Sequence, residues 1–298
     1  MKKIIVATVL AAIGSTATLA ADLGARAPYT KAPTMMASVS SWTGWYAGLN
    51  AGWAGGGDGV STIGTVSPAS TAIPLNAVQM AAGATTSLRG SDVFVGGGQF
   101  GYNYQFSPLF VAGIEADIQG LSRSRRSGSN SVSFQGAGPP GASVGFATNV
   151  VHTLEPSFLG TVRGRLGVTL NPSLLLYATG GLAYGGVKSR TAISQSGINA
   201  IGTDQPPFTI TPASGAFSGV RVGYAAGAGG EWMFASNWSA KLEYLYYDLG
   251  SATYSTGSLV SSDFQPTNYQ GAGFGAVNTT AKVRFNDHIV RAGVNYHF

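Results

Sequence analysis

The most constraining feature of this sequence is a strict alternation of apolar and polar side chains that returns along the chain. In residues 158–170 the even positions are apolar or glycine, and the odd positions include Arg163 and Arg165. Successive side chains of a β-strand point to opposite faces, so a period of two predicts strands with one apolar and one charged face. The pattern occurs in eight segments, at about 45–53, 93–106, 110–121, 157–170, 174–187, 219–234, 238–249 and 282–298.

The composition indicates that much of the surface faces something other than water. Charged residues make up 10% of the chain and the mean hydropathy is +0.16, whereas a soluble domain has roughly 25% charged residues. After residue 20 there is no apolar run of the about 18 residues that a membrane helix needs. A closed β-barrel is the other way to pair every backbone polar group in lipid, and its strands alternate as these do.

Charge and cysteine content exclude other classes of protein. The formal net charge of +5 is small and scattered, so we expect no nucleic acid partner. The chain has no cysteine, which rules out disulfides, thiolate metal sites and a cysteine nucleophile.

The connections between the predicted strands alternate in length. Short joins lie at 107–109, 171–173 and 235–237, and long joins lie at 54–92, 122–156, 188–218 and 250–281. Outer-membrane barrels have short periplasmic turns and long outer loops. We therefore predict an all-β fold, an eight-stranded antiparallel transmembrane β-barrel over residues 43–298, with four long outer loops and both termini periplasmic.

The N-terminus has the pattern of an export signal. Lys2 and Lys3 precede an apolar segment at 4–13, and small residues follow up to Ala20. This pattern predicts a cleaved signal peptide over residues 1–20. Residues 21–42 lack periodicity, and we predict a flexible periplasmic lead-in there. The expected location is the outer membrane of a Gram-negative bacterium.

The charged faces of the predicted strands share one lumen. Three-residue turns place Glu231 opposite Lys241, Gln99 opposite Asp117, and Leu170 opposite Leu174. An eight-stranded barrel is just wide enough to be filled by side chains, so we predict a salt-bridged plug. The predicted lumen network is Glu115, Asp117, Arg163, Arg165, Glu231, Lys241, Glu243 and Arg291, with Asp287 as a fifth acid.

Outward aromatic residues gather near the predicted strand ends, where membrane-interface girdles form. Trp53 and Tyr246 fall near the outer rim. The group at the short-turn end is Phe106, Phe110, Phe234, Trp238, Tyr296 and Phe298.

Three segments resemble a known family. They are Ser41–Asn50 (SWTGWYAGLN), Lys241–Gly250 (KLEYLYYDLG) and Ile289–Phe298 (IVRAGVNYHF), with Lys31-Ala32-Pro33 in the lead-in. The sequence resembles the porin-like outer-membrane protein family of the Rhizobiales, which includes the Omp25 and Omp31 type surface proteins. The resemblance implies an abundant, surface-exposed envelope protein and, in some members, haemin binding. The C-terminal Val294, Tyr296 and Phe298 also resemble the signal that the barrel-assembly machinery reads.

Few residues point to chemistry. His152 and His288 fall near the predicted outer rim, where two histidines can ligate haem iron or a metal, although unrelated rim side chains are the simpler interpretation. Asp287 and His288 alternate inward and outward, so they diverge and favour no hydrolase. Arg123, Arg125 and Arg126 begin the second long join, and we hypothesise that they contact lipopolysaccharide phosphates.

These observations favour a structural, surface-exposed barrel that supports the envelope and is not an enzyme. Two alternatives remain open. Inward glycines such as Gly181 and Gly227 leave room for a small diffusion porin, and the outer loops are candidates for binding haemin or another ligand. No cofactor is expected apart from that haemin. The expected partners are outer-membrane lipids, lipopolysaccharide and, during biogenesis, the barrel-assembly machinery.

Overall fold

The computed structural model describes residues 41–55, 59–66, 85–88, 93–122, 125–137, 142–201, 210–261 and 276–298. Residues 1–40, with the predicted signal peptide and nearly all of the lead-in, lie outside the described residues, and so does Arg123. The described chain is all-β, and no helix in it is long and apolar enough to cross a membrane.

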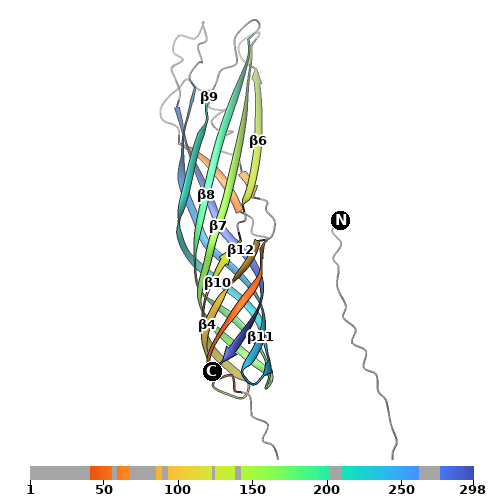
Figure 1. Cartoon of the computed structure of the whole chain (residues 1–298). Coiled ribbons are helices and arrows are strands. Elements are labelled where there is room, and N and C mark those ends of the chain that lie inside the picture. The colour runs from red at the N-terminus through yellow and green to blue at the C-terminus, as the bar shows by residue number, and fades with distance from the viewer. Residues whose placement is uncertain are drawn as a thin grey trace, which may run out of the picture. The chain divides into compact units, whose positions relative to one another are not determined.

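Twelve strands make up the described chain (Figure 1). They are β1 (Gly44–Gly55), β2 (Gly59–Val66), β3 (Thr85–Leu88), β4 (Val93–Gln105), β5 (Phe110–Leu121), β6 (Arg126–Ala137), β7 (Ala142–Asn171), β8 (Leu174–Ile201), β9 (Ile210–Thr211), β10 (Ala213–Ala235), β11 (Trp238–Ser261) and β12 (Ala276–His297).

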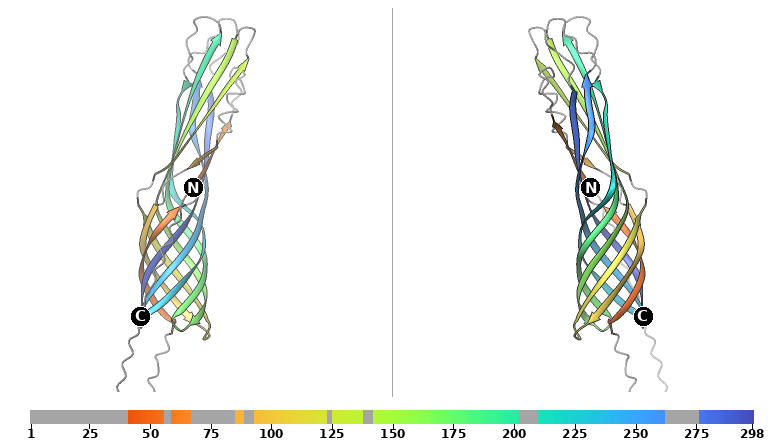
Figure 2. Two further views of the ribbon diagram at one scale, coloured as in Figure 1. Left: turned by 90° about the vertical axis from the view of Figure 1, so that its right-hand side faces the viewer. Right: turned by 90° about the vertical axis from the view of Figure 1, so that its left-hand side faces the viewer.

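Eight of these strands close into a ring, which Figure 2 shows from two sides. Each strand pairs antiparallel with the next in the order β1, β4, β5, β7, β8, β10, β11, β12, and β12 returns to pair with β1. A closed ring leaves no strand edge without a partner, which is what a lipid environment requires. The eight segments predicted from alternation each lie in one of these strands, and the predicted eight-stranded antiparallel barrel is confirmed.

The predicted register is correct except beside two of the three short turns. Beside 235–237, the expected pairing of Phe234 with Trp238 is wrong, because Ala235 pairs with Trp238 and Phe234 is the extra residue of a β-bulge. Glu231 pairs with Lys241 and Gln99 pairs with Asp117, as predicted. The pairing of Leu170 with Leu174 is wrong, because Asn171 pairs with Leu174 and Leu170 is the extra residue of a β-bulge. The bulge absorbs the difference between a two-residue and a three-residue turn, so the register farther along both strands is unchanged.

At the end opposite the short turns, strands continue far beyond the predicted boundaries (Figure 1). β7 and β8 have 30 and 28 residues, whereas about 9–11 residues cross a bilayer. Much of the predicted loops is therefore strand. We call this region the extension; it contains β6 and the parts of β7, β8, β10, β11 and β12 at 142–156, 188–201, 213–221, 250–261 and 276–285.

For β7 and β11, the sequence pattern predicted strands that are too short, and the reason is physical. β7 has a register shift between Pro156 and Phe158, and β11 has one between Asp248 and Ser251. A bulge inserts one residue, so every side chain beyond it changes face. A search for unbroken alternation therefore stops at the bulge, although the strand continues.

The outward face of the ring is apolar. Leu49, Leu166 and Leu242 have 74%, 66% and 62% of their surface exposed, values that suit contact with lipid chains. Trp53 is exposed near the other rim, whereas Tyr246 is only partly exposed. The aromatic residues predicted at the short-turn end are all exposed: Phe106, Phe110, Phe234, Trp238, Tyr296 and Phe298.

Candidate functional site

The interior of the ring is filled by three layers of side chains, and the layer at the short-turn end is apolar. Its buried members are Trp42, Val111, Leu175, Tyr177 and Met233. Trp42 was assigned to the flexible lead-in, which is wrong for this residue, because Trp42 is fully buried and its backbone N–H donates to Gln105 Oε1 at 3.1 Å. The chain thus closes this end of the ring with its own side chains before β1 begins.

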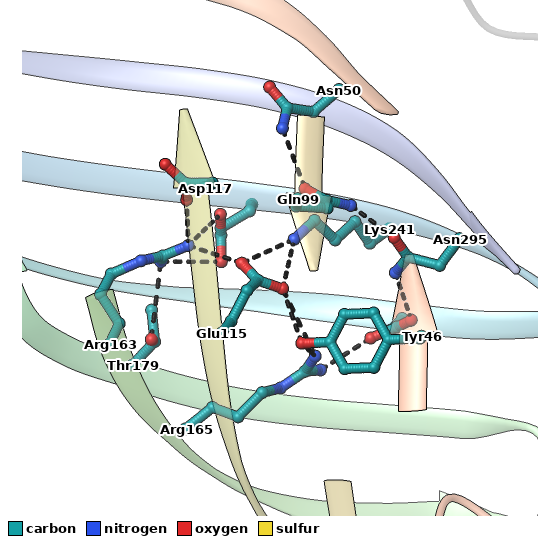
Figure 3. A network of polar contacts seen from close by, with 12 residues as sticks. Tyr46, Asn50, Gln99, Glu115, Asp117, Arg163, Arg165, Thr179, Lys241 and Asn295 are labelled. Atoms are coloured by element: carbon teal, nitrogen blue, oxygen red, sulfur yellow. Dashed lines mark hydrogen bonds and ion pairs between the residues drawn. The ribbon is translucent and has the colours of Figure 1, made fainter. Parts of the chain in front are cut away.

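The middle layer is an ion-pair network around Arg163 (Figure 3). Arg163 Nη2 lies 2.6 Å from Glu115 Oε1 and 2.9 Å from Asp117 Oδ2, and its Nη1 lies 3.1 Å from Glu243 Oε1. The Arg163 side chain has no exposed surface. One guanidinium thus bridges carboxylates that come from β5 and β11.

The remaining cations of the layer each meet at least one of these acids or Glu231. Arg291 Nη2 lies 2.8 Å from Asp117 Oδ2 and 2.5 Å from Glu243 Oε2. Lys241 Nζ lies 2.9 Å from Glu115 Oε2, and Arg165 Nη2 lies 2.7 Å from Glu231 Oε2. The structure therefore brings together all eight residues predicted for the lumen network.

Neutral polar side chains add further hydrogen bonds to this layer. Tyr46 donates to Glu115 Oε2 at 2.8 Å and accepts from Arg165 Nη1 at 2.9 Å. Gln99 donates to Asn295 Oδ1 at 2.5 Å, and Asn295 donates to Glu231 Oε1 at 2.7 Å (Figure 3). Tyr46, Gln99 and Asn295 were not part of the predicted lumen network, although their parity places them on the inner face.

The third layer, toward the extension, is largely apolar and also holds one buried ion pair, between Arg126 and Asp287. It was not predicted. Its buried residues are Ala54, Val93, Val95, Leu154, Leu159, Ala183, Val187, Ala225, Leu245, Tyr247, Leu249, Ala252, Val283, Phe285 and Ile289. Ions and water therefore meet apolar side chains on both sides of the ionic layer, within the part of the chain that the structure describes.

The position of Arg126 differs from the one predicted from the sequence. It was predicted to contact lipopolysaccharide phosphates, but it is buried and forms an ion pair with Asp287 inside the ring. The described inner face thus carries five acids, Asp287 included, and five cations. The sequence-based list had five acids and only four cations. This imbalance was the signal that one further cation had to point inward, since an unpaired buried charge costs several kcal/mol.

Of the other two arginines of this group, the structure describes only Arg125, which does not join Arg126. Arg125 is exposed and pairs with Glu155 at 2.7 Å. Arg123 lies outside the described residues.

His152 and His288 lie on opposite faces of the wall. The bulge beside Pro156 turns His152 inward, where it is fully buried; its Nδ1 lies 2.7 Å from Thr191 Oγ1 and its Nε2 lies 3.3 Å from Ser189 Oγ. Burial lowers the pKa of the His152 imidazole to about 4, so it is neutral at physiological pH. His288 points outward and its Nδ1 lies 2.6 Å from the Tyr244 hydroxyl. This geometry does not support one iron shared between the two histidines.

The predicted assembly signal is accessible from outside the ring. Val294 and Tyr296 are exposed on the outward face of β12, and the C-terminal residue Phe298, which follows β12, is exposed as well. The Phe298 N–H donates to the Trp45 carbonyl at 3.0 Å, which ties the C-terminus to β1.

A closed antiparallel ring with an apolar outward face and a filled, ion-paired interior is a membrane-spanning β-barrel. The chain belongs to the outer membrane protein beta-barrel domain family, whose sequence model matches residues 8–298. The family resemblance noted from the three sequence segments is therefore confirmed.

Curated relatives cover the whole chain. The 31 kDa outer-membrane immunogenic protein of Brucella melitensis is 34% identical over 100% of both chains. The 25 kDa outer-membrane immunogenic protein of Brucella abortus is 25% identical over 99% of this chain and 97% of the relative. Among solved structures, the outer membrane protein OprG of Pseudomonas aeruginosa has a TM-score of 0.35 at 12% identity and covers 86% of this chain and 97% of its own.

Proposed function

We propose that this outer-membrane protein is a closed structural barrel that strengthens the envelope and displays its extension at the cell surface. The observation that carries the proposal is the filled interior, in which an ion-paired layer lies between two apolar layers. The role is non-enzymatic, and the curated relatives are named as immunogenic outer-membrane proteins.

The filled interior speaks against the alternative of a diffusion porin. Arg163, Arg291 and Glu243 have at most 1% of their side-chain surface exposed. Hydrating these groups to open a path would break several short ion pairs at once. The inward glycines, which favoured a lumen, are contact points instead: a Cβ on Gly227 would lie 2.1 Å from the Tyr244 carbonyl oxygen.

Conductance in planar bilayers tests this proposal. The purified full chain is expected to give no steady channel, since the ionic layer leaves no continuous aqueous path between the two apolar layers. A trimeric porin inserted under the same conditions serves as the positive control for insertion and detection. Steady current steps that scale with salt concentration would contradict the closed barrel and favour the porin.

We further propose that the short-turn end faces the periplasm and the extension faces outward. A cleaved signal peptide at 1–20 would deliver the chain to the periplasm, and the barrel-assembly machinery would read the exposed Phe298 end. Outer-membrane lipids and lipopolysaccharide would then surround the outward face. The word immunogenic in the relatives' names fits an extension exposed to the outside.

Labelling of single-cysteine variants tests this orientation, because the natural chain has no cysteine. Ser196 is exposed in the extension, and Ser236 is exposed in a short turn. On intact cells, a large membrane-impermeant maleimide is expected to label S196C and not S236C. After the outer membrane is permeabilised, both should react. Labelling of S236C alone on intact cells would reverse the orientation.

A further inference from the structure

The outward face of β11 and β12 changes from apolar to charged over a short distance. Along β12 the outward residues Val290, His288, Asn286, Arg284 and Lys282 run from an apolar side chain to two cations. On β11 the neighbouring residues change in step, since Tyr246 pairs with His288 and Ser251 pairs with Arg284. Such a gradient marks the level at which a barrel leaves the lipid interface.

Two cations lie just beyond this level. Arg284 and Lys282 are exposed on β12, next to Ser251 and Thr253 of β11. Arg221 of β10 does not share this outward face, because it alternates with the outward Val220 and Val222. It borders the site only through a hydrogen bond from its Nη2 to the Ser251 carbonyl at 2.5 Å.

The bulge in β11 positions the guanidinium group of Arg284. Gly250 has a φ of +75°, and its N–H donates to Asp248 Oδ1 at 2.8 Å. The other carboxylate oxygen, Asp248 Oδ2, accepts from Arg284 Nε at 3.1 Å and Nη2 at 2.5 Å. Asp248 is nearly buried, whereas 58% of the Arg284 side chain remains exposed. The guanidinium is therefore held in place and still open to a ligand.

The surface below the cations fits an acylated ligand. Leu242 and Val290 have 62% and 52% of their surface exposed on β11 and β12. Tyr224 and Tyr246, with ring centroids 6.2 Å apart, lie at the level between these apolar residues and the cations. By contrast, β1 and β4 present Trp53 and Phe94 near their outer ends and no cation on their described outward faces.

The geometry points to a site for the phosphorylated headgroup of an outer-leaflet glycolipid on β10, β11 and β12. Arg284 and Lys282 bind the phosphate, because a guanidinium group matches phosphate oxygens in geometry and charge and the lysine adds a second positive charge. The tyrosines border the sugar, and the acyl chains lie along the apolar residues below. This inference rests on the proposed orientation, and it replaces Arg126 with cations that sequence analysis did not select.

Binding of lipid A to the purified full chain in detergent, measured by native mass spectrometry, tests the site. The K282Q/R284Q variant is expected to bind bisphosphorylated lipid A about tenfold more weakly, equivalent to ~1.4 kcal/mol. The matched control R125Q/R190Q removes two exposed cations from the β6–β8 side and should change binding less than about twofold. Dephosphorylated lipid A should bind the natural chain as weakly as phosphorylated lipid A binds K282Q/R284Q.

Several outcomes would overturn the inference. These are unchanged binding in K282Q/R284Q, an equal loss in both double variants, or equal binding of lipid A with and without phosphate. Retention of inorganic phosphate alone at the site would show an ion site rather than a lipid site. If K282Q/R284Q does not give a heat-modifiable band on a cold gel, the single variant K282Q provides the same test, because Lys282 is exposed on β12. Conductance is a separate readout, so a conducting barrel that still binds lipid A would contradict only the closed-barrel proposal.

Discussion

Replacing Arg163 by methionine is expected to lower the free energy of unfolding by roughly 3–5 kcal/mol, the range for removing one partner from a buried ion pair. Arg163 contacts Glu115, Asp117 and Glu243 at 2.6, 2.9 and 3.1 Å. Methionine fills similar volume but leaves these carboxylates with one cation fewer in a layer that excludes water. Urea unfolding in lipid vesicles, followed by tryptophan fluorescence, measures the loss.

An exposed ion pair provides the control for this prediction. Arg125 pairs with Glu155 at 2.7 Å, yet 72% and 40% of the two side chains are exposed. R125M should therefore cost less than about 1 kcal/mol. R163M/E243Q should recover part of the loss, because it removes one carboxylate charge from a layer that has lost one cation, while Arg291 still pairs with Asp117. Equal small losses in R163M and R125M would mean that the lumen network does not stabilise the barrel.

Replacing Gly181 by alanine is expected to destabilise the barrel by roughly 1–3 kcal/mol, the usual cost of overpacking a filled interior. A Cβ at Gly181 would lie 2.2 Å from the Val162 carbonyl oxygen and 2.7 Å from the Arg163 Cα atom. Both atoms are backbone, so relief requires β7 and β8 to separate. The same unfolding experiment measures the effect.

The adjacent residue gives a matched control. Gly180 points outward, and the nearest atom to its Cβ would be the Ala225 carbonyl oxygen at 3.8 Å, an ordinary contact. G180A should be neutral or stabilise by about 0.4–1 kcal/mol through the unfolded chain. If G180A and G181A had the same effect, glycine would act here through backbone flexibility and not through close strand contact.

The sequence predicted the strands inside the membrane because their signal is local. Alternation of Arg163 and Arg165 with apolar neighbours is a property of one short segment, and it states which face each residue occupies. Short turns then fix the register of adjacent strands, as for Glu231 and Lys241. Neither step needs information from distant parts of the chain.

The errors begin where strand parity changes. His152 was expected near the outer rim, in the predicted join at 122–156, but it lies within β7 and points inward beyond the bulge beside Pro156. The extension carries small polar residues on both faces, with Thr191 and Thr256 buried and Ser194 and Thr253 exposed, so it lacks the contrast that marks a strand in lipid. Contrast fails there, parity also changes in β7 and β11, and strand appears as loop.

The sequence by itself determined the class of this protein: an outer-membrane chain of eight alternating strands, with a charged inner face and an apolar outer face. The tertiary structure alone decided which charges meet. Arg163 of β7 and Glu243 of β11 are separated by 80 residues, and Arg126 joins Asp287 across 161 residues. These pairings depend on how far side chains reach across the closed ring and on where bulges turn the strands. Both are set by the curvature of the whole wall, which no single segment of the sequence encodes.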